Sequence, residues 1–213
     1  MNKVEFSAEC QQCTRLADFL KEVKQANPDY YCKPVVPFGA AKPKLLIVGL
    51  APGLHGANAT GRPFTGDFAG ILLYQTLYKF GFSNQAVSES LNDKLKLKQC
   101  RITNAVKCLP PENKPTSEEI NTCNQFLADE LNSLPKNTII LALGGIAHKA
   151  ILKALTLKIK DYPFGHDTWY TLPNGLQLAT SYHCSKYNTS TKRLTEAMFH
   201  EVFRKIRKTI DAR

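Results

Sequence analysis

Two continuous apolar segments of strand length stand out along the chain, and polar alternation is missing from both. They are residues 44–50 (KLLIVGL) and 137–144 (NTIILALG). Uninterrupted apolar runs of this length are typical of parallel strands that are covered on both faces. Residues 100–107 (CRITNAVK) also have the composition of a strand. We therefore predict buried strands at these three places.

Between these runs, apolar residues recur every three or four positions, which predicts helices. Leu16, Phe19, Leu20 and Val23 show this spacing within a helix expected over residues 8–26. Thr116 and Glu119 have the spacing of a capping box, which marks a helix start. The other expected helices cover residues 68–80, 116–134 and 145–155, and a basic amphipathic tail from Thr189.

The remaining segments contain loops and two short β runs. Residues 27–43 are rich in Pro, Gly and aromatics and are expected to form a loop, whereas the polar residues 83–98 predict no element. Residues 168–172 and 176–182 have β character and flank a Pro-Asn-Gly turn.

The alternation of strands and helices predicts the α/β class with a largely parallel sheet. We expect one domain over residues 1–213, built as a three-layer αβα sandwich around a mostly parallel, four-stranded sheet. Ligand sites in such sheets gather in loops at the carboxyl ends of the strands. Three loops satisfy this rule, namely 51–67, 104–111 and 182–193.

Composition excludes several classes of protein. Of 213 residues, 43% are hydrophobic and 22% are charged, which is unlike a disordered chain or a collagen-like fibre. We find no apolar stretch of the roughly 18 residues that a membrane helix needs. Residues 1–10 lack the apolar core of a signal peptide. We therefore expect a cytoplasmic protein that makes no membrane contact and keeps its thiols reduced.

The net charge of +10 is concentrated near the C-terminus. Residues 149–213 carry 12 basic and 5 acidic side chains and so contribute +7 of that charge. A basic excess of this kind suits a polyanionic partner such as nucleic acid. A solvated basic helix would give the same charge pattern.

Seven cysteines in a chain of this kind point to metal binding or catalysis more than to disulfides. Cys10 and Cys13 form a CxxC pair, and Cys108 and Cys123 form a more distant second pair. Four thiolates suit zinc and an iron–sulfur cluster equally well. The CxxC pair could instead be a redox pair. From the spacing alone, a four-cysteine site and a chance arrangement explain the four cysteines equally well. The isolated cysteines are expected to be buried hydrophobes; they are Cys32, Cys100 and Cys184.

The loop GLAPGLHGANATGRPFTGD, residues 49–67, is the most unusual segment. It lacks the ending of a phosphate-binding P-loop and the spacing of a dinucleotide fingerprint. Phe64 is an aromatic residue within this loop, where it can stack on a planar base or pin the loop to the core. Asp67 closes the loop, and helix capping alone would explain it.

A second polar loop, SYHCSKYNTSTKRLT at residues 181–195, combines His183 with hydroxyl, amide and basic side chains. Such a loop, leading into a helix, suits contacts with phosphates. A polar loop with a helix cap is the simpler explanation.

Taken together, these segments resemble the uracil-DNA glycosylase superfamily, and most closely its family 5, the UDGb-type group. The matching motifs are the CxxC pair, residues 49–67, ITNAVKCLPP with Cys123 downstream, and residues 181–195. Family 4 enzymes carry Glu where this chain has Leu50. The histidine motif departs from the usual His-Pro-Ser, because Cys184 stands in the Pro position, and Tyr187 replaces an expected polar residue.

The resemblance implies a monomeric DNA repair enzyme that removes uracil from DNA and so initiates base excision repair. Members of this family often also remove other deaminated bases, such as hypoxanthine or xanthine, so the resemblance leaves these open as further substrates. Phe64 would stack on a base swung out of the DNA, and Asn104 would read its edge. His183 would stabilise the departing base, and Asp67 would stabilise the sugar cation and activate water.

The resemblance also assigns the surrounding residues. Backbone amides at Ala51, Gly53 and Leu54 would line the pocket. DNA phosphates would be gripped by Ser185, Lys186, Thr189 and Lys192. A [4Fe–4S] cluster would be held by Cys10, Cys13, Cys108 and Cys123, in an architectural role.

Two functions of other classes compete with this interpretation. The first is a non-catalytic nucleic-acid-binding protein with a structural four-cysteine metal site, for which Phe64, Asp67, Asn104 and His183 would share no task. The second is a small electron carrier, which needs less α/β architecture than this chain predicts. Metal analysis together with an assay on uracil-containing DNA separates all three.

Overall fold

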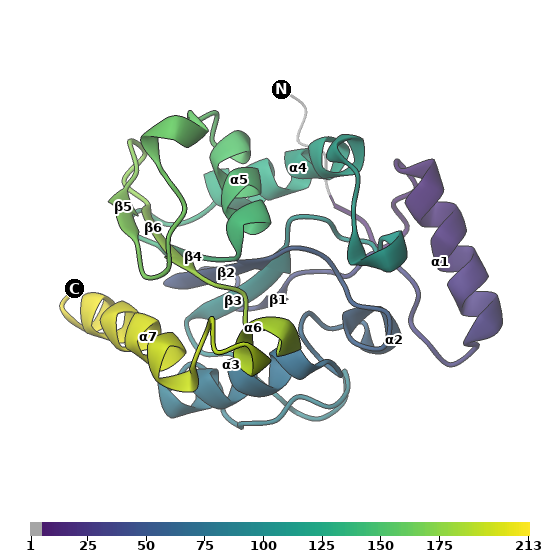
Figure 1. Ribbon diagram of the computed structural model, residues 1–213, viewed down its shortest axis with the longest axis horizontal. Coiled ribbons are helices and arrows are strands. Elements are labelled where there is room, and N and C mark those ends of the chain that lie inside the picture. Colours follow the sequence, from purple (N-terminus) through teal and green to yellow (C-terminus); the bar gives the residue numbers. More distant parts are fainter. Residues whose placement is uncertain (1–5) are drawn as a thin grey trace.

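A six-stranded sheet organises the chain in the computed structural model, which describes residues 6–213 (Figure 1). The strand order is β1-β3-β2-β4-β6-β5, and the four central strands are parallel. The strands are β1 Phe38–Gly39, β2 Leu45–Gly49, β3 Cys100–Asn104, β4 Ile139–Leu143, β5 Trp169–Thr171 and β6 Gln177–Ser181. Residues 1–5, which belong to the segment judged to lack a signal peptide and to the expected domain 1–213, lie outside the described residues.

Helices cover both faces of this sheet, so the predicted α/β class and layered arrangement are confirmed. The α-helices are α1 Thr14–Ala26, α2 Ala57–Thr60, α3 Phe68–Lys79, α4 Ser117–Asn132, α5 Gly145–Ala154, α6 Lys186–Ser190 and α7 Glu196–Asp211. Two short 3-10 helices lie between these elements, η1 Pro111–Asn113 before α4 and η2 Ile159–Asp161 after α5. In Figure 1, α4 and α5 lie above the sheet and α3 and α7 lie below it.

The two faces of the sheet belong to separate cores because side chains alternate along each strand. Leu45 and Ile47 of β2 pack with α3 and α7, whereas Leu46 and Val48 pack with α4 and α5. All five residues of β2 are buried. This explains why the sequence of the strand is apolar throughout and shows no alternation.

The sheet has six strands, so the expectation of four was wrong. β1 pairs antiparallel with β3 at one edge, and β5 pairs antiparallel with β6 at the other. β1 is only two residues long and lies within the 27–43 segment that was expected to be a loop. A strand of two residues is too short to show periodicity. It forms because it pairs with β3.

The predicted helix boundaries also need correction at both ends of the chain. α1 begins at Thr14, and not at residue 8, because the cysteine-containing residues before it form turns. The C-terminal tail is divided into α6 and α7. Lys192, with φ of +58°, and the fully buried Leu194 interrupt the helix there.

Helix capping follows the sequence closely. Thr116 and Glu119 form the predicted capping box at the start of α4. Asp67 caps α3 by accepting a hydrogen bond from the amide of Gly70 at 2.9 Å.

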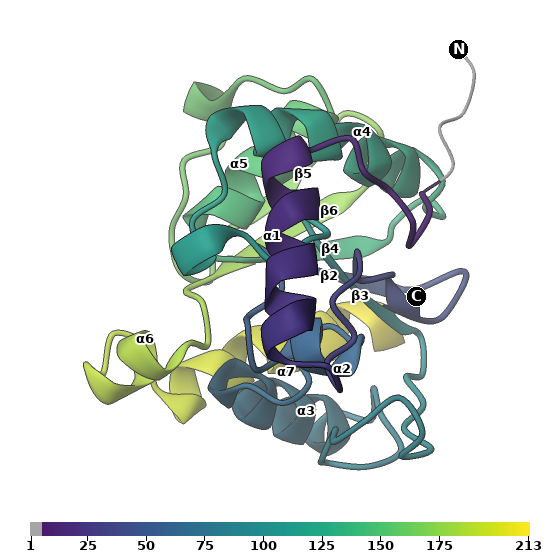
Figure 2. The same cartoon turned by 90° about the vertical axis from the view of Figure 1, so that its right-hand side faces the viewer.

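Helix α1 lies across one side of the layers, as Figure 2 shows. Its Leu16 packs in a cluster with Phe126 of α4, and its Leu20 packs in a cluster with Leu109 of the loop after β3. No helix in residues 6–213 has the length and apolar character required to cross a bilayer.

Candidate active site

The ends of β2 and β3 bring two predicted site residues together. Gly49 ends β2 and is paired with Asn104, which ends β3. A Cβ atom on Gly49 would lie 2.5 Å from Asn104 Oδ1 and 2.6 Å from Phe64 Cζ. Only glycine leaves room at this position, so Phe64 and Asn104 meet over the end of β2.

Asn104 has an unused hydrogen-bonding group in a buried place. The residue is 4% exposed, and within residues 6–213 no donor reaches its Oδ1 atom. A buried acceptor without a partner costs free energy, about 1–3 kcal/mol. A ligand that offers an N–H group at this point would remove that cost.

Phe64 and His183 form a stacked pair at the same place. Their ring centroids lie 5.9 Å apart with an interplanar angle of 27°. Phe64 adopts a left-handed backbone conformation with φ of +56°, which is unusual for a residue with a bulky side chain. His183 lies two residues beyond the end of β6, and burial lowers the pKa of its imidazole to about 4. The imidazole is therefore neutral near pH 7 and still carries one N–H donor.

Asp67 reaches the same loop from the N-terminus of α3. A Cβ atom on Gly56 would lie 2.6 Å from Asp67 Oδ2, and one on Gly53 would lie 3.7 Å from it. Burial raises the pKa of Asp67, while hydrogen bonds from the amides of Gly70 and Ala69 act in the opposite direction. The carboxyl group thus stands over the glycine-rich turn, where a side chain on Gly56 would displace it.

The loop after β2 offers backbone donors. In the described part of the chain, the N–H groups of Ala51, Gly53 and Leu54 donate to no protein acceptor. Ala51 packs against the cluster that contains Leu16, and Leu54 packs beside Val23 of α1. The amides can therefore serve a ligand while the side chains fix the loop to the N-terminal region.

The predicted phosphate-binding residues lie on and beside α6. Ser185 is its N-cap and accepts a hydrogen bond from Asn188 N, and the Asn188 side chain donates to the carbonyl of His183 at 2.8 Å. The Thr189 hydroxyl donates to carbonyl groups of its own helix. Lys186 and Lys192 are exposed and take part in no ion pair among the residues described, so both ammonium groups are available to an anion.

The four paired cysteines surround one small apolar cavity. Cys10 and Cys13 reach it from before α1, Cys108 from the loop after β3, and Cys123 from α4. Burial raises the pKa of Cys13 to about 11, and the thiolates of Cys123 and Cys10 add to the shift. The donor set suits a soft metal or an iron–sulfur cluster. Yet no group of three or more His, Cys, Asp or Glu in residues 6–213 has an arrangement that could hold a single metal ion.

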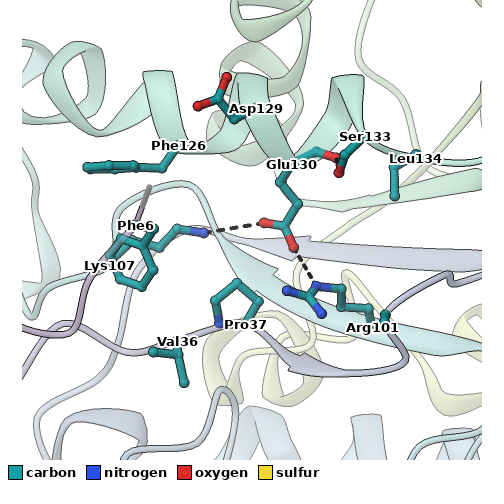
Figure 3. A pocket seen from close by; sticks show the side chains of 11 residues that line it. Phe6, Val36, Pro37, Arg101, Lys107, Phe126, Asp129, Glu130, Ser133 and Leu134 are labelled. Atoms are coloured by element: carbon teal, nitrogen blue, oxygen red, sulfur yellow. Dashed lines mark hydrogen bonds and ion pairs between the residues drawn. The ribbon is translucent and has the colours of Figure 1, made fainter. Parts of the chain in front are cut away.

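A separate cavity of about 440 Å³ lies between β3 and α4 (Figure 3). Its wall contains Glu130, which accepts a hydrogen bond from Arg101 at 2.7 Å and pairs with the buried Lys107 at 3.6 Å. The backbone N–H of Lys107 donates to Cys123 Sγ at 3.4 Å. None of the residues predicted to act on a base or on DNA lines this cavity.

Two features of the site had no clear signal in the sequence. The close approach at Gly49 requires three segments to be in place before it can be recognised. Arg62 is almost fully buried in an ion pair with Asp93, and the two residues lie 31 positions apart in a segment without periodicity. A buried arginine looks like a surface arginine in a sequence.

The sequence of this chain is similar to those of known proteins. Residues 36–207 match the model of the family described as the uracil DNA glycosylase superfamily. The type-5 uracil-DNA glycosylase of Thermus thermophilus is 45% identical over 91% of this chain and 90% of its own length. That of Mycobacterium leprae is 40% identical over 93% of this chain and 90% of its own. A type-4 uracil-DNA glycosylase of Pyrobaculum aerophilum is 35% identical over only 66% of this chain and 65% of its own length.

Proposed function

The chain belongs to the uracil-DNA glycosylase superfamily and matches its type-5 members over most of its length, and we propose on this premise that it hydrolyses the bond between uracil and deoxyribose in DNA. The reaction would initiate base excision repair. The observation that carries the proposal is the meeting of Phe64, Asn104 and His183 at the strand ends, with Asp67 above the adjoining glycine turn.

Asn104 would select the base by its edge. Uracil presents a carbonyl oxygen beside an N–H group, and a side-chain amide can donate to the first and accept from the second. Cytosine presents the opposite order of donor and acceptor. The unpartnered Oδ1 of Asn104 supports this assignment, because a base N–H would satisfy it. Phe64 would stack on the face of the flipped base.

Bond cleavage moves charge in two directions. A water oxygen bonds to the sugar C1′ while the bond from C1′ to N1 of the base breaks, and the bonding electrons leave with the base. Asp67 would stabilise the positive sugar and accept the water proton. The neutral His183 would donate a hydrogen bond to the O2 atom of the base as negative charge develops there.

The four gathered cysteines fit an iron–sulfur cluster by their donor chemistry and their shared apolar cavity. We assign Cys10, Cys13, Cys108 and Cys123 as its ligands. When bound, the cluster would cross-link the start of α1, the loop after β3 and α4. Ala51 packs against this same group of residues, so the cross-link would hold the loop after β2 in shape. We assign it no redox step.

DNA contact would extend from the pocket across α6. Lys186 and Lys192 would attract phosphates by charge, and the half-buried Ser185 at the N-cap of α6 would add its hydroxyl as a hydrogen-bond donor. Thr189 would have to release its hydroxyl from the carbonyl groups of α6 to make the same contact. We further propose a cytoplasmic monomer. An assay of base release from duplex and single-stranded DNA containing uracil, hypoxanthine or xanthine tests the function and defines its range.

Substitution of Asn104 by alanine is expected to lower kcat/KM for uracil DNA by about 10- to 100-fold, since two hydrogen bonds of about 1 kcal/mol each are lost. Preference for uracil over other bases should weaken with it. Asn124→Ala is a matched control, because it removes a buried amide that bonds to Ala150 O, away from the pocket. An unchanged base preference in Asn104→Ala would contradict edge reading.

Replacement of Cys123 by serine is expected to reduce bound iron and labile sulfide and to lower Tm. Visible absorbance, iron content and thermal unfolding measure these losses directly. Cys100→Ser is the control, because Cys100 is also buried but lies in β3 outside the set of four. A Cys123→Ser protein that keeps its full iron content would remove this residue from the cluster. Zinc in the purified wild-type chain would instead favour a structural zinc site.

A further inference from the structure

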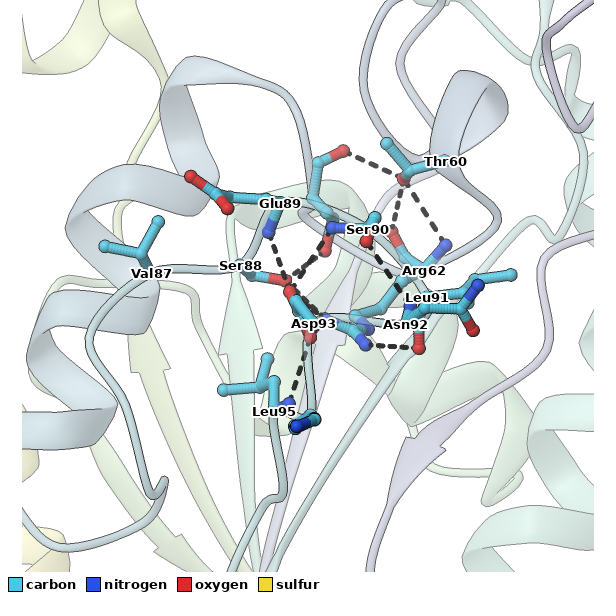
Figure 4. A network of polar contacts seen from close by, with 12 residues as sticks. Thr60, Arg62, Val87, Ser88, Glu89, Ser90, Leu91, Asn92, Asp93 and Leu95 are labelled. Carbon is cyan, nitrogen blue, oxygen red and sulfur yellow. Dashed lines mark hydrogen bonds and ion pairs between the residues drawn. The ribbon is translucent and has the colours of Figure 1, made fainter.

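The segment between α3 and β3 packs against the turn that carries Phe64 and Asp67. Residues 83–98 contain no helix and no strand longer than an isolated bridge between Ser83 and Leu97. Figure 4 shows this segment around the side chain of Arg62, which is met by the side chains of Ser88 and Asp93 and by the carbonyl of Leu91. The middle of an otherwise irregular segment is thereby bonded to one cation.

Arg62 is 2% exposed, and its guanidinium group is held on several sides. Nη1 donates to both carboxylate oxygens of Asp93 at 2.8 Å and to Ser88 Oγ at 2.9 Å. Nη2 donates to Leu91 O at 3.1 Å, and the guanidinium carbon lies 4.6 Å from the centre of the Phe38 ring in β1. A planar guanidinium group with these contacts is fixed in one orientation.

Asp93 organises the other side of the contact. Its carboxylate accepts hydrogen bonds from the amides of Glu89, Ser90 and Leu95, at 2.8, 3.2 and 3.0 Å. Burial alone would raise the pKa of Asp93, but Arg62 and these amides lower it to about 2. The Asp93 carboxylate is therefore charged near neutral pH, as the ion pair requires.

The turn beyond Arg62 is fixed at three more points. Ser88 Oγ lies 2.6 Å from Thr65 Oγ1, Tyr74 Oη donates to Pro63 O at 2.7 Å, and Thr60 Oγ1 donates to Thr65 O at 3.1 Å. Phe64 lies between these anchors in its left-handed conformation. Such a conformation persists only where the surrounding structure enforces it.

We propose that Arg62 and Asp93 are positioning residues for the glycosylase reaction. The buried pair holds the turn of residues 60–67 so that the Phe64 ring faces Asn104 and His183 and the Asp67 carboxyl lies over the glycine turn. The pair touches neither the base nor the reacting water. The inference rests on the proposed function, since it concerns the residues that would bind and cleave there.

The test compares Arg62→Lys, Arg62→Met and Asp93→Asn with the wild-type chain. At saturating enzyme and well below the Tm of each variant, the single-turnover rate should fall about 10- to 100-fold in Arg62→Lys and further in Arg62→Met. The dissociation constant for uracil DNA should change little, because α6 and its lysines are not altered. Hydrogen exchange of the amides in residues 60–67 should become faster in step with the loss of rate.

Arg101→Lys is the control, because Arg101 also forms an ion pair with a mostly buried carboxylate, Glu130 of α4, although the Arg101 side chain is more exposed than that of Arg62. It should lower Tm without changing the single-turnover rate. Ser88→Ala is a milder second variant that keeps both charges and should give a smaller loss of rate. A folded Arg62→Lys protein with the wild-type rate and unchanged exchange at residues 60–67 would overturn the inference. Absence of uracil release by the wild-type chain would refute the proposed function instead, and the exchange data would still test the contact.

Discussion

Asp67→Asn is expected to reduce the single-turnover rate of uracil release by about 10²- to 10⁴-fold, the range attributed to a positioned general base. Asparagine is nearly isosteric and is also a good helix N-cap, so it can still accept the hydrogen bond from Gly70 N and preserve α3. What it removes is the negative charge that faces the sugar cation and receives the water proton. The loss should therefore appear in the rate, with no loss of stability or of DNA affinity.

The pH dependence gives this prediction a second readout. Burial raises the pKa of Asp67, so the wild-type rate should fall as pH decreases through that raised value. The residual rate of Asp67→Asn should lack this acidic limb. Asp211→Asn removes one exposed carboxylate at the end of α7 and serves as the charge-matched control. An Asp67→Asn protein with full activity and an unchanged pH profile would exclude Asp67 from the mechanism.

How far the sequence determines the fold depends on the length of each element. β2 and β4 could be predicted because both faces are buried, which leaves a continuous apolar run. β1 could not be predicted, because Phe38 and Gly39 become a strand only by pairing with Ile102 and Arg101 of β3. Local sequence carries no information on a partner more than sixty residues away.

The candidate site divides in the same way. Asp67 and His183 stand in loops whose composition is unusual, so they could be singled out one by one. Their common location follows from the parallel sheet, which brings the ends of β2, β3 and β6 to one edge. Residues 83–98 could not be connected to the site, because they are held by contacts with the side chain of Arg62 and with one another, and show no repeating pattern.

Substitution of His183 by alanine is expected to lower the single-turnover rate by about 10²- to 10³-fold, the usual effect of removing one donor from a developing oxyanion. The imidazole is suited to this role because burial lowers its pKa to about 4, so it stays neutral at physiological pH and leaves the pH profile to Asp67. His183→Gln retains an N–H donor and should lose less activity than His183→Ala.

His183 also stacks on Phe64, so the loss of its hydrogen-bond donor has to be distinguished from the loss of its packing. Removal of the ring alone would disturb the base pocket and raise KM for uracil DNA, whereas removal of the donor lowers the maximal rate. His200→Gln is the control, since His200 is a buried histidine whose neighbours are Lys79 and Glu196, away from the strand ends. Equal rates for His183→Ala and His183→Gln, with the change confined to KM, would assign His183 to packing. A lower maximal rate in His183→Ala than in His183→Gln would show that His183 stabilises the negative charge that develops on the departing base.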